Sequence, residues 1–419
     1  MPDLDAARDL LRFIDASPSP FHACATAAAR LDAAGFARVA EIDAWPADSN
    51  RAYLIRDGSL VAWSVPDSAI ATTPFRIIGA HTDSPNLRVK PHADVERAGA
   101  QLLAVEVYGG PLYNSWLDRD LGLAGRVALR GGDLRLLHVD RAIARIPQLA
   151  IHLDREVNVS GLVLNPQQHL NPVWAIGNAD FSAFVAAELG VGADEILFWD
   201  LMLLDVTPGS LLGRDDELIS AGRIDNLCSS WAAVEAVINA TGSNEIGVVV
   251  LFDHEEVGSS SNRGAMSPML EAALERITLG LGGGREEWRR ALAASICLSA
   301  DMAHATHPNY SERHEPGHWI AINGGPVVKT NVSQRYATDA RSAAEFVEAC
   351  ERVDVPVQHY VHRNDLVCGS TIGPITAARL GISTVDVGAP QLSMHSAREL
   401  MGSTDAALYK TALTAFLTT

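Results

Sequence analysis

Three apolar runs along this chain stop directly before a residue of a type that binds metal ions. The runs cover residues 75–80, 246–252 and 296–300, and the residues that follow them are His81, Asp253 and Asp301. Short apolar runs bounded by polar residues are typical of buried strands. Because open α/β sheets bind ligands beyond the carboxyl ends of their strands, we expect polar residues from several strand ends to meet in one crevice.

The rest of the pattern predicts an α/β fold with a β-rich insert. Helical spacing over 5–13 and 21–34 opens the chain. After residue 91 come short alternating strands with a hairpin turn at Gly131-Gly132-Asp133, and the predicted strands are 104–107, 125–129, 134–139 and 196–205. Helices and strands alternate again from a helix at 225–238. We therefore predict a catalytic domain of residues 1–91 and 213–419, with a central mixed, largely parallel sheet flanked by helices, and an inserted β-rich domain of residues 92–212.

Composition narrows the function classes. The formal net charge of −18 argues against nucleic-acid binding, which needs basic patches. No apolar run is long enough to span a membrane, and the acidic stretch from Met1 to Asp9 does not resemble a secretion signal. The five cysteines are scattered and contain no Cys-x-x-Cys pair, which indicates buried thiols in a reducing compartment. We expect a cytoplasmic protein.

Five residues carry the candidate chemistry, two histidines and three carboxylates near predicted strand or helix ends. They are His81, Asp225, one of the neighbouring pair Glu255 and Glu256, Asp301 and His395. This inventory is typical of a two-metal hydrolase. One glutamate of the pair would bind metal, and the other would be the general base that takes a proton from a metal-bound water.

Each candidate also has a simpler interpretation. His81-Thr82-Asp83 is either a polar turn or a ligand whose ring is oriented by Asp83. Asp225 either caps the helix that follows it or bridges two cations. The segment 253–256 is either a solvated acidic turn or the source of a ligand and a base. The joint placement of all five candidates, rather than any one of them, favours the metal site.

Eight segments in order along the chain resemble the aspartyl aminopeptidase family of zinc metallopeptidases, in its bacterial form. These segments are Ser17-Pro18-Ser19-Pro20-Phe21-His22, Gly79-Ala80-His81-Thr82-Asp83-Ser84-Pro85, Asp118-Arg119-Asp120-Leu121, Ile151-His152-Leu153-Asp154-Arg155, Arg223-Ile224-Asp225-Asn226, Phe252-Asp253-His254-Glu255-Glu256-Val257-Gly258-Ser259, Asp301-Met302-Ala303-His304 and Ser393-Met394-His395-Ser396-Ala397-Arg398-Glu399.

The resemblance implies specific roles. One zinc ion would be held by His81 and Asp301, the other by Glu256 and His395, with Asp225 bridging. Glu255 would be the general base and Asp83 the residue that orients His81. The insert would serve oligomerisation, usually into a tetrahedral dodecamer, and would send His152 into a neighbouring subunit's active site. Substrate contacts would come from His152, Glu255, Asp301, His304, Lys329 and Tyr336.

The resulting hypothesis is a two-metal aminopeptidase that removes an N-terminal Asp or Glu from short peptides. Zn²⁺ is the expected cation, and such sites also accept Co²⁺ or Mn²⁺. The alternatives are a neutral-residue aminopeptidase or deacylase with the same metals, a non-catalytic oligomeric scaffold, and a module that binds acidic peptides without turnover. We expect no nucleic-acid or membrane partner.

Overall fold

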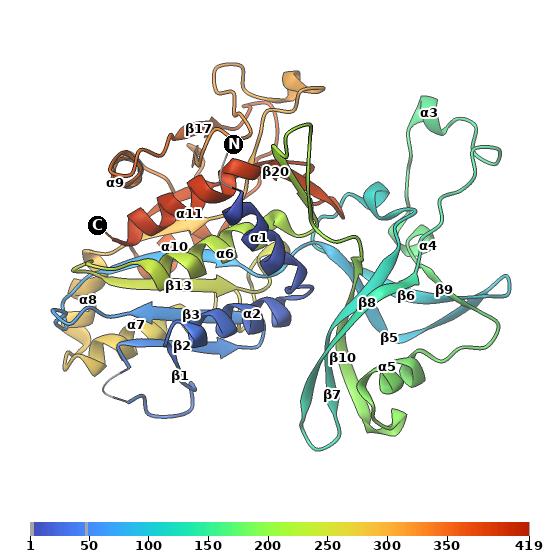
Figure 1. Cartoon of the computed structure of the whole chain (residues 1–419), viewed down its shortest axis with the longest axis horizontal. Helices are drawn as coiled ribbons and strands as arrows, with labels where there is room; N and C mark the ends of the chain where they lie inside the picture. Colours follow the sequence, from blue (N-terminus) through green and yellow to red (C-terminus); the bar gives the residue numbers. More distant parts are fainter. Residues whose placement is uncertain (1–3, 47–48, 419) are drawn as a thin grey trace.

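A mixed sheet forms the centre of the larger domain in the computed structural model, which describes residues 4–46 and 49–418. The first three residues of the acidic N-terminal stretch therefore lie outside the described residues. The sheet order is β1-β2-β3-β13-β4-β14-β18-β16-β17, and most of its neighbouring strands are parallel (Figure 1). The strands are β1 (Ala37–Arg38), β2 (Arg51–Arg56), β3 (Ser59–Ser64), β4 (Phe75–His81), β13 (Ile246–Phe252), β14 (Ile296–Ala300), β16 (Val327–Thr330), β17 (Gln358–Val361) and β18 (Ser383–Gly388).

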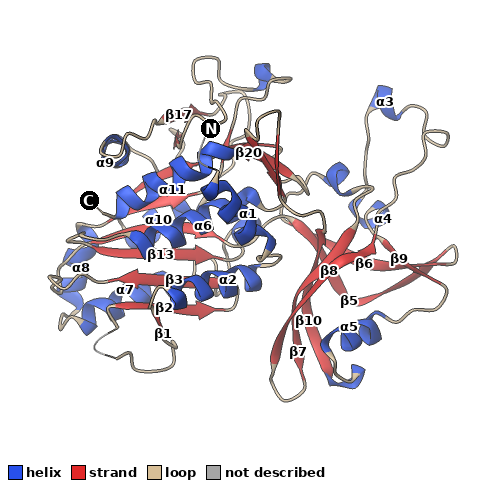
Figure 2. Cartoon of the chain, in the orientation of Figure 1, coloured by secondary structure: helices blue, strands red, loops and turns tan. Residues whose placement is uncertain are grey.

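Helices cover both faces of this sheet, as Figure 2 shows. Alternate strand residues supply the two cores: Ile78 and Ala80 of β4 belong to one cluster, while Phe75 and Ile77 belong to the other. The first cluster includes residues of α1 (Asp5–Asp15), α2 (Pro20–Ala33), α6 (Ile224–Asn239), α9 (Ala340–Glu351) and α11 (Ser403–Leu417). The second includes residues of α7 (Met269–Gly280), α8 (Arg285–Ala293) and α10 (Ile372–Leu380). The α/β fold class predicted from the sequence is confirmed.

A second, antiparallel sheet stands beside the first, in the order β8-β7-β10-β5-β6-β9. The predicted turn at Gly131-Gly132-Asp133 joins β7 to β8. The elements of this region are β5 (Asn86–Arg97), β6 (Ala100–Tyr108), η1 (Tyr113–Trp116), β7 (Leu121–Leu129), β8 (Leu134–Ala144), α3 (Val157–Ser160), α4 (Pro166–His169), β9 (Val173–Ile176), α5 (Phe181–Leu189), η2 (Ala193–Glu195) and β10 (Ile196–Asp205). Figure 1 shows α3 on a loop that extends away from both sheets. The division into residues 92–212 and the rest remains a proposal, and β5 begins before its first boundary.

A third, smaller sheet joins the end of the insert to the C-terminal part of the chain. Its order is β11-β12-β20-β19-β15. These strands and the remaining short helices are β11 (Ser210–Leu212), β12 (Leu218–Ala221), β15 (Ala303–His304), β19 (Pro390–Leu392), β20 (Glu399–Gly402), η3 (Glu255–Val257) and η4 (Ser311–Arg313).

Two expectations from composition concern the whole chain. Within the described residues, no helix combines the length and the apolar character that a membrane crossing requires. The five cysteines are unpaired thiols, and all but Cys368 are buried.

Candidate metal centre

Three predicted ligands lie where neighbouring parallel strands end. β4 lies between β13 and β14 and runs parallel to both. His81 is the last residue of β4, Glu256 lies in η3 just after β13, and Asp301 directly follows β14. Because parallel strands end at the same edge of a sheet, the apolar runs bring these three side chains to one place.

Asp225 reaches the same place from the start of α6. Its backbone and that of Asn226 have non-helical dihedral angles at this point of the helix. Oδ1 of Asp225 accepts no hydrogen bond from the described residues, so the side chain is not seen to cap the helix. Its buried carboxylate lies between two imidazoles, with Oδ1 3.4 Å from Nε2 of His81 and Oδ2 3.6 Å from Nε2 of His395.

The other ligand atoms divide into two groups that share Asp225. Nε2 of His81 lies 3.6 Å from Oδ1 of Asp301. Nε2 of His395 lies 3.3 Å from Oε2 of Glu256. Each oxygen of Asp225 thus belongs with one histidine and one further carboxylate.

The chemistry of these atoms fits a bound divalent cation. Oδ1 of Asp225 and Oε1 of Glu256 are buried without a hydrogen-bond partner among the described residues. Atoms of His81, Asp225 and Glu256 lie within 4.8 Å of one another. Burial, together with the Asp225 carboxylate, raises the pKa of Glu256 well above its usual range. A cation would relieve this repulsion, and imidazole nitrogen and carboxylate oxygen are zinc ligands.

Glu255 lies beside these ligands and lines a cavity of about 450 Å³ in front of them. Its Oε2 is 4.0 Å from Nε2 of His81. Burial raises the pKa of Glu255 to about 8, with smaller contributions from nearby carboxylates such as Asp301. The alternative of a solvated acidic turn is wrong, because Asp253 is 1% exposed and the Glu256 side chain 5% exposed.

Two peptide carbonyls orient the two histidines. Nδ1 of His81 lies 2.9 Å from the carbonyl oxygen of Asp83, and the carboxylate of Asp83 is farther away, at 3.4 Å. Nδ1 of His395 lies 3.0 Å from the carbonyl oxygen of Gly110, in the insert. In both rings Nδ1 faces an acceptor, so Nε2 is left to bind a metal. Asp83 is the predicted partner of His81, and the closer of its groups is the carbonyl rather than the carboxylate.

The carboxylate of Asp83 instead holds the turn that carries the base. Its two oxygens accept hydrogen bonds from the backbone N–H groups of Glu255 and Glu256, each at 3.1 Å. The hydroxyl of Tyr108 donates to the same carboxylate at 2.7 Å. Asp83 is fully buried, so these bonds fix the position of the turn in a region that excludes water.

The predicted substrate contacts divide into two sets. His304, Lys329 and Tyr336 line the cavity, together with Gly258, Ser259, Met302, Gly369, Ser370, Thr371, Ile375 and Met394. Lys329 is buried and donates to the carbonyl oxygens of Asp301 at 2.9 Å and Met302 at 3.1 Å. Burial favours the neutral form of Asp301, but Lys329 and His81 outweigh it and lower the pKa of Asp301.

His152 belongs to the second set. It is exposed on the loop that leads to α3, and it does not line this cavity in the described part of the chain.

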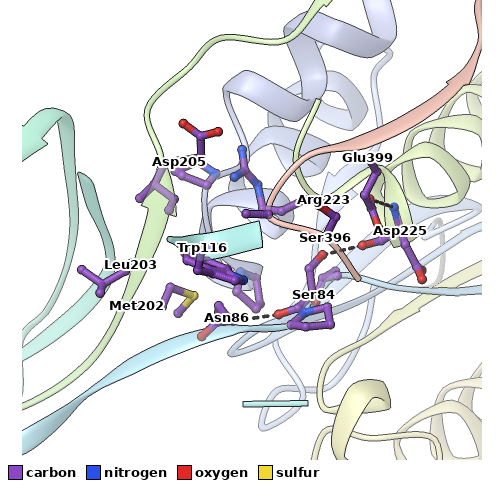
Figure 3. Close-up of a pocket in the computed structure, with 17 residues that line it drawn as sticks. Ser84, Asn86, Trp116, Met202, Leu203, Asp205, Arg223, Asp225, Ser396 and Glu399 are labelled. Atoms are coloured by element: carbon purple, nitrogen blue, oxygen red, sulfur yellow. Dashed lines mark hydrogen bonds between the residues drawn. The ribbon is translucent and has the colours of Figure 1, made fainter. Parts of the chain in front are cut away.

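Sequence reasoning assigned no role to Glu399, although its carboxylate accepts the backbone N–H groups of the candidate ligands Asp225 and His395. Figure 3 shows Glu399 and Ser84 on either side of Asp225, at a small cavity of about 30 Å³ between the insert and the larger domain. Ser84 donates to the carbonyl oxygen of Asp225 at 2.6 Å. The available signals for Glu399 were its position four residues after a candidate ligand histidine and its place in a segment that resembles the family.

Comparisons with known proteins show which proteins this chain resembles in sequence and fold. Residues 13–417 match the family model described as aminopeptidase I zinc metalloprotease (M18). A probable M18 family aminopeptidase 2 from Streptomyces coelicolor is 54% identical over 417 residues, which cover 98% of this chain and 96% of the relative. Among solved structures, a chain of the cryo-EM complex of Ape4 and Nbr1 is 35% identical, with a TM-score of 0.95, over 99% of this chain and 85% of that chain. The S. cerevisiae mApe1 dodecamer is 28% identical, with a TM-score of 0.86, over 99% of this chain and 96% of that chain.

Proposed function

This chain belongs to the aminopeptidase I zinc metalloprotease (M18) family, and we propose that it uses two divalent cations to remove N-terminal Asp or Glu from short peptides. Family membership makes the protein a metallo-aminopeptidase with zinc as its metal. The number of cations, the acidic preference and the roles of individual residues are the proposal. Cytoplasmic location is proposed with it.

The observation that carries the two-cation proposal is the position of the Asp225 carboxylate. Its two oxygens face different histidines, at 3.4 Å and 3.6 Å, and each histidine has its own second carboxylate. A single cation would leave one of these two ligand groups unused. Under the proposal His81 and Asp301 hold one cation, Glu256 and His395 hold the other, and Asp225 bridges.

Glu255 is proposed as the general base. Bound cations would supply Lewis-acid chemistry, lowering the pKa of an attacking water and polarising the scissile carbonyl. Glu255 accepts the proton of that water and passes it to the leaving amine. Burial raises the pKa of this carboxylate, and bound cations would act in the opposite direction. Asp83 holds the backbone of this turn and thereby keeps Glu255 beside the ligands.

Lys329 is the proposed selector of acidic side chains. It is the lysine that lines the cavity, and the net charge of −18 makes a local cation necessary for an acidic substrate. The substrate's free α-amine would meet carboxylates of the metal centre, which favours removal of terminal residues over internal cleavage. His304 and Tyr336 would complete the substrate contacts.

We also propose a homo-oligomer, a tetrahedral dodecamer by analogy with the yeast mApe1 assembly. The support in this chain is the loop around His152, whose large apolar side chains are exposed. These side chains are Leu149, Ile151, Leu153, Val159 and Val163. Exposed apolar surface of this kind is typical of a contact site. His152 would then reach a neighbouring subunit's cavity and stabilise the developing oxyanion.

The test is hydrolysis of Asp-, Glu- and Leu-p-nitroanilides, and of N-acetyl-Asp-p-nitroanilide, by the purified assembled protein with added Zn²⁺, Co²⁺ or Mn²⁺. The proposal expects turnover of the free-amine acidic substrates, none of the acetylated one, and a loss of at least about 10³-fold in Glu255→Gln. Leu turnover without acidic preference would indicate a neutral aminopeptidase. Release of acetate from the acetylated substrate would indicate a deacylase. A protein that binds acidic peptides without hydrolysing them would be a binding module. A folded assembly that neither binds nor hydrolyses them would be a non-catalytic scaffold.

A further inference from the structure

Glu399 is a buried carboxylate that the proposed reaction does not use. It is 2% exposed and begins β20. Its Oε2 accepts the backbone N–H of Asp225 at 2.9 Å, and its Oε1 accepts the backbone N–H of His395 at 2.8 Å. Gln391 also donates to Oε1, at 3.4 Å. Figure 3 shows the carboxylate beside Asp225.

These hydrogen bonds join two parts of the centre that are far apart in the sequence. Asp225 comes from the start of α6, and His395 from the loop between β19 and β20. The side chains of these two residues face each other at 3.6 Å between Oδ2 and Nε2. The backbone N–H groups of Asp225 and His395 both donate to the Glu399 carboxylate. The position of this carboxylate therefore determines how far apart the side chains of Asp225 and His395 lie.

We propose that Glu399 is a positioning residue for the cation site formed by His395, Glu256 and Oδ2 of Asp225. This inference rests on the two-cation function proposed above. These hydrogen bonds are buried, so they fix the two backbone segments to one side chain. Residues that orient metal ligands typically change metal affinity 10- to 100-fold when they are replaced. The other site depends less on Glu399, because His81 and Asp301 are held at the strand ends.

Glu399→Gln is the sharpest variant, because glutamine keeps the shape of the side chain but has one acceptor oxygen. Its NH₂ group must face either the N–H of Asp225 or the N–H of His395. One backbone donor is thereby left facing another donor, while the volume of the core is unchanged. Asp405→Asn is the matched control. Asp405 is also a buried carboxylate that accepts two backbone N–H groups, those of Asn323 at 2.6 Å and Gly325 at 2.9 Å.

The experiment titrates metal-free wild type, Glu399→Gln and Asp405→Asn with Co²⁺, followed by calorimetry and by the visible absorption of the bound ion. We expect wild type and Asp405→Asn to bind two equivalents with the same affinities. Glu399→Gln should bind its first equivalent within about threefold of wild type and its second about 10- to 100-fold more weakly. Excess metal should restore kcat in this variant, which it would not do if the substitution had only loosened the fold.

The outcomes separate this inference from the function it rests on. A second equivalent bound by Glu399→Gln within threefold of wild type overturns the positioning role and leaves the two-cation function intact. A wild type that binds a single equivalent overturns both. If Glu399→Gln does not fold by circular dichroism, Glu399→Asp takes its place. That variant keeps the charge but is one methylene too short to reach both N–H groups, and it should lose the same second-site affinity.

Discussion

The hydroxyl of Tyr108 donates a hydrogen bond to the carboxylate of Asp83 at 2.7 Å. Tyr108 is the last residue of β6, in the antiparallel sheet, whereas Asp83 follows β4 of the central sheet. The residues that follow Tyr108 lie beside the proposed second cation site, where the carbonyl of Gly110 faces Nδ1 of His395. The base of the insert is therefore one wall of the candidate metal centre.

Tyr108→Phe tests how much this contact between the insert and Asp83 contributes to activity. The change removes the hydroxyl and leaves one oxygen of Asp83 with a single backbone donor. A hydrogen bond from a neutral donor to a buried carboxylate contributes roughly 1.5 to 3 kcal/mol, so we expect kcat/KM to fall about 10- to 100-fold. Steady-state kinetics on an acidic p-nitroanilide would measure the change.

Tyr53→Phe is the control for that experiment. Tyr53 donates to the Asp32 carboxylate at 2.8 Å, outside the residues that form the centre. This variant should lose stability and keep wild-type kcat/KM. Equal kinetic losses in both variants would show that Tyr108 acts only through general stability.

The sequence predicted the residues at strand ends because an apolar run and the polar residue that stops it are adjacent in the chain. β13 and β14 have the predicted bounds of 246–252 and 296–300. Tyr108 and Glu399 could not be assigned a role in this way. Their partners are distant in sequence, and several of those partners are peptide groups, which have no residue signature. The carbonyl of Gly110, for example, lies 285 residues from the imidazole it orients.

Asp225 shows a second limit of sequence reasoning. An Asp before an apolar-periodic helix fits a cap as well as a ligand. Only the tertiary packing that brings His81 and His395 to its two oxygens distinguishes these interpretations.

Removing the metal should lower the thermal stability of the protein as well as abolish activity. Without a cation, the buried carboxylates of Asp225 and Glu256 repel each other. A cation that binds the folded state but not the unfolded chain stabilises the fold by mass action. We expect the Tm to fall by several degrees after treatment with a chelator and to recover when Zn²⁺ is added back. Differential scanning calorimetry would measure both steps. Asp225→Asn should show a much smaller response, and an equal response in that variant would contradict the ligand assignment.

Lys329→Met tests the origin of the proposed acidic preference. Methionine fills the buried position without a charge, so the ratio of kcat/KM for Asp- and Leu-p-nitroanilide should fall about 10- to 100-fold. The carbonyls of Asp301 and Met302 lose their donor, which should also cost about 1 to 3 kcal/mol of stability. If activity falls on both substrates while the ratio of their kcat/KM values stays unchanged, Lys329 supports Asp301 and does not select acidic side chains.

The junction between the larger domain and the insert should become less stable in acid through His22. This ring, on α2, lies 5.8 Å from the ring of His138 on β8 and 2.7 Å from the hydroxyl of Ser19. Burial, followed by the charges of His138 and Arg223, lowers the pKa of His22 to about 4. The unfolded chain has the ordinary value near 6.5, so between these values the unfolded state binds the additional proton. Stability is therefore retained above pH 6.5 and lost as the pH falls toward 4, by about 2 to 3 kcal/mol.

Denaturant unfolding of wild type and His22→Gln at half-unit steps from pH 7.5 to 4 would measure this contribution. Acid also protonates the metal ligands and releases the metal, but it does so in both proteins, and the use of metal-free protein removes metal release from the comparison. We expect the curve of His22→Gln to be flatter than that of wild type below pH 6.5 and parallel to it above. Parallel curves over the whole range would show that His22 does not carry the acid sensitivity of this junction.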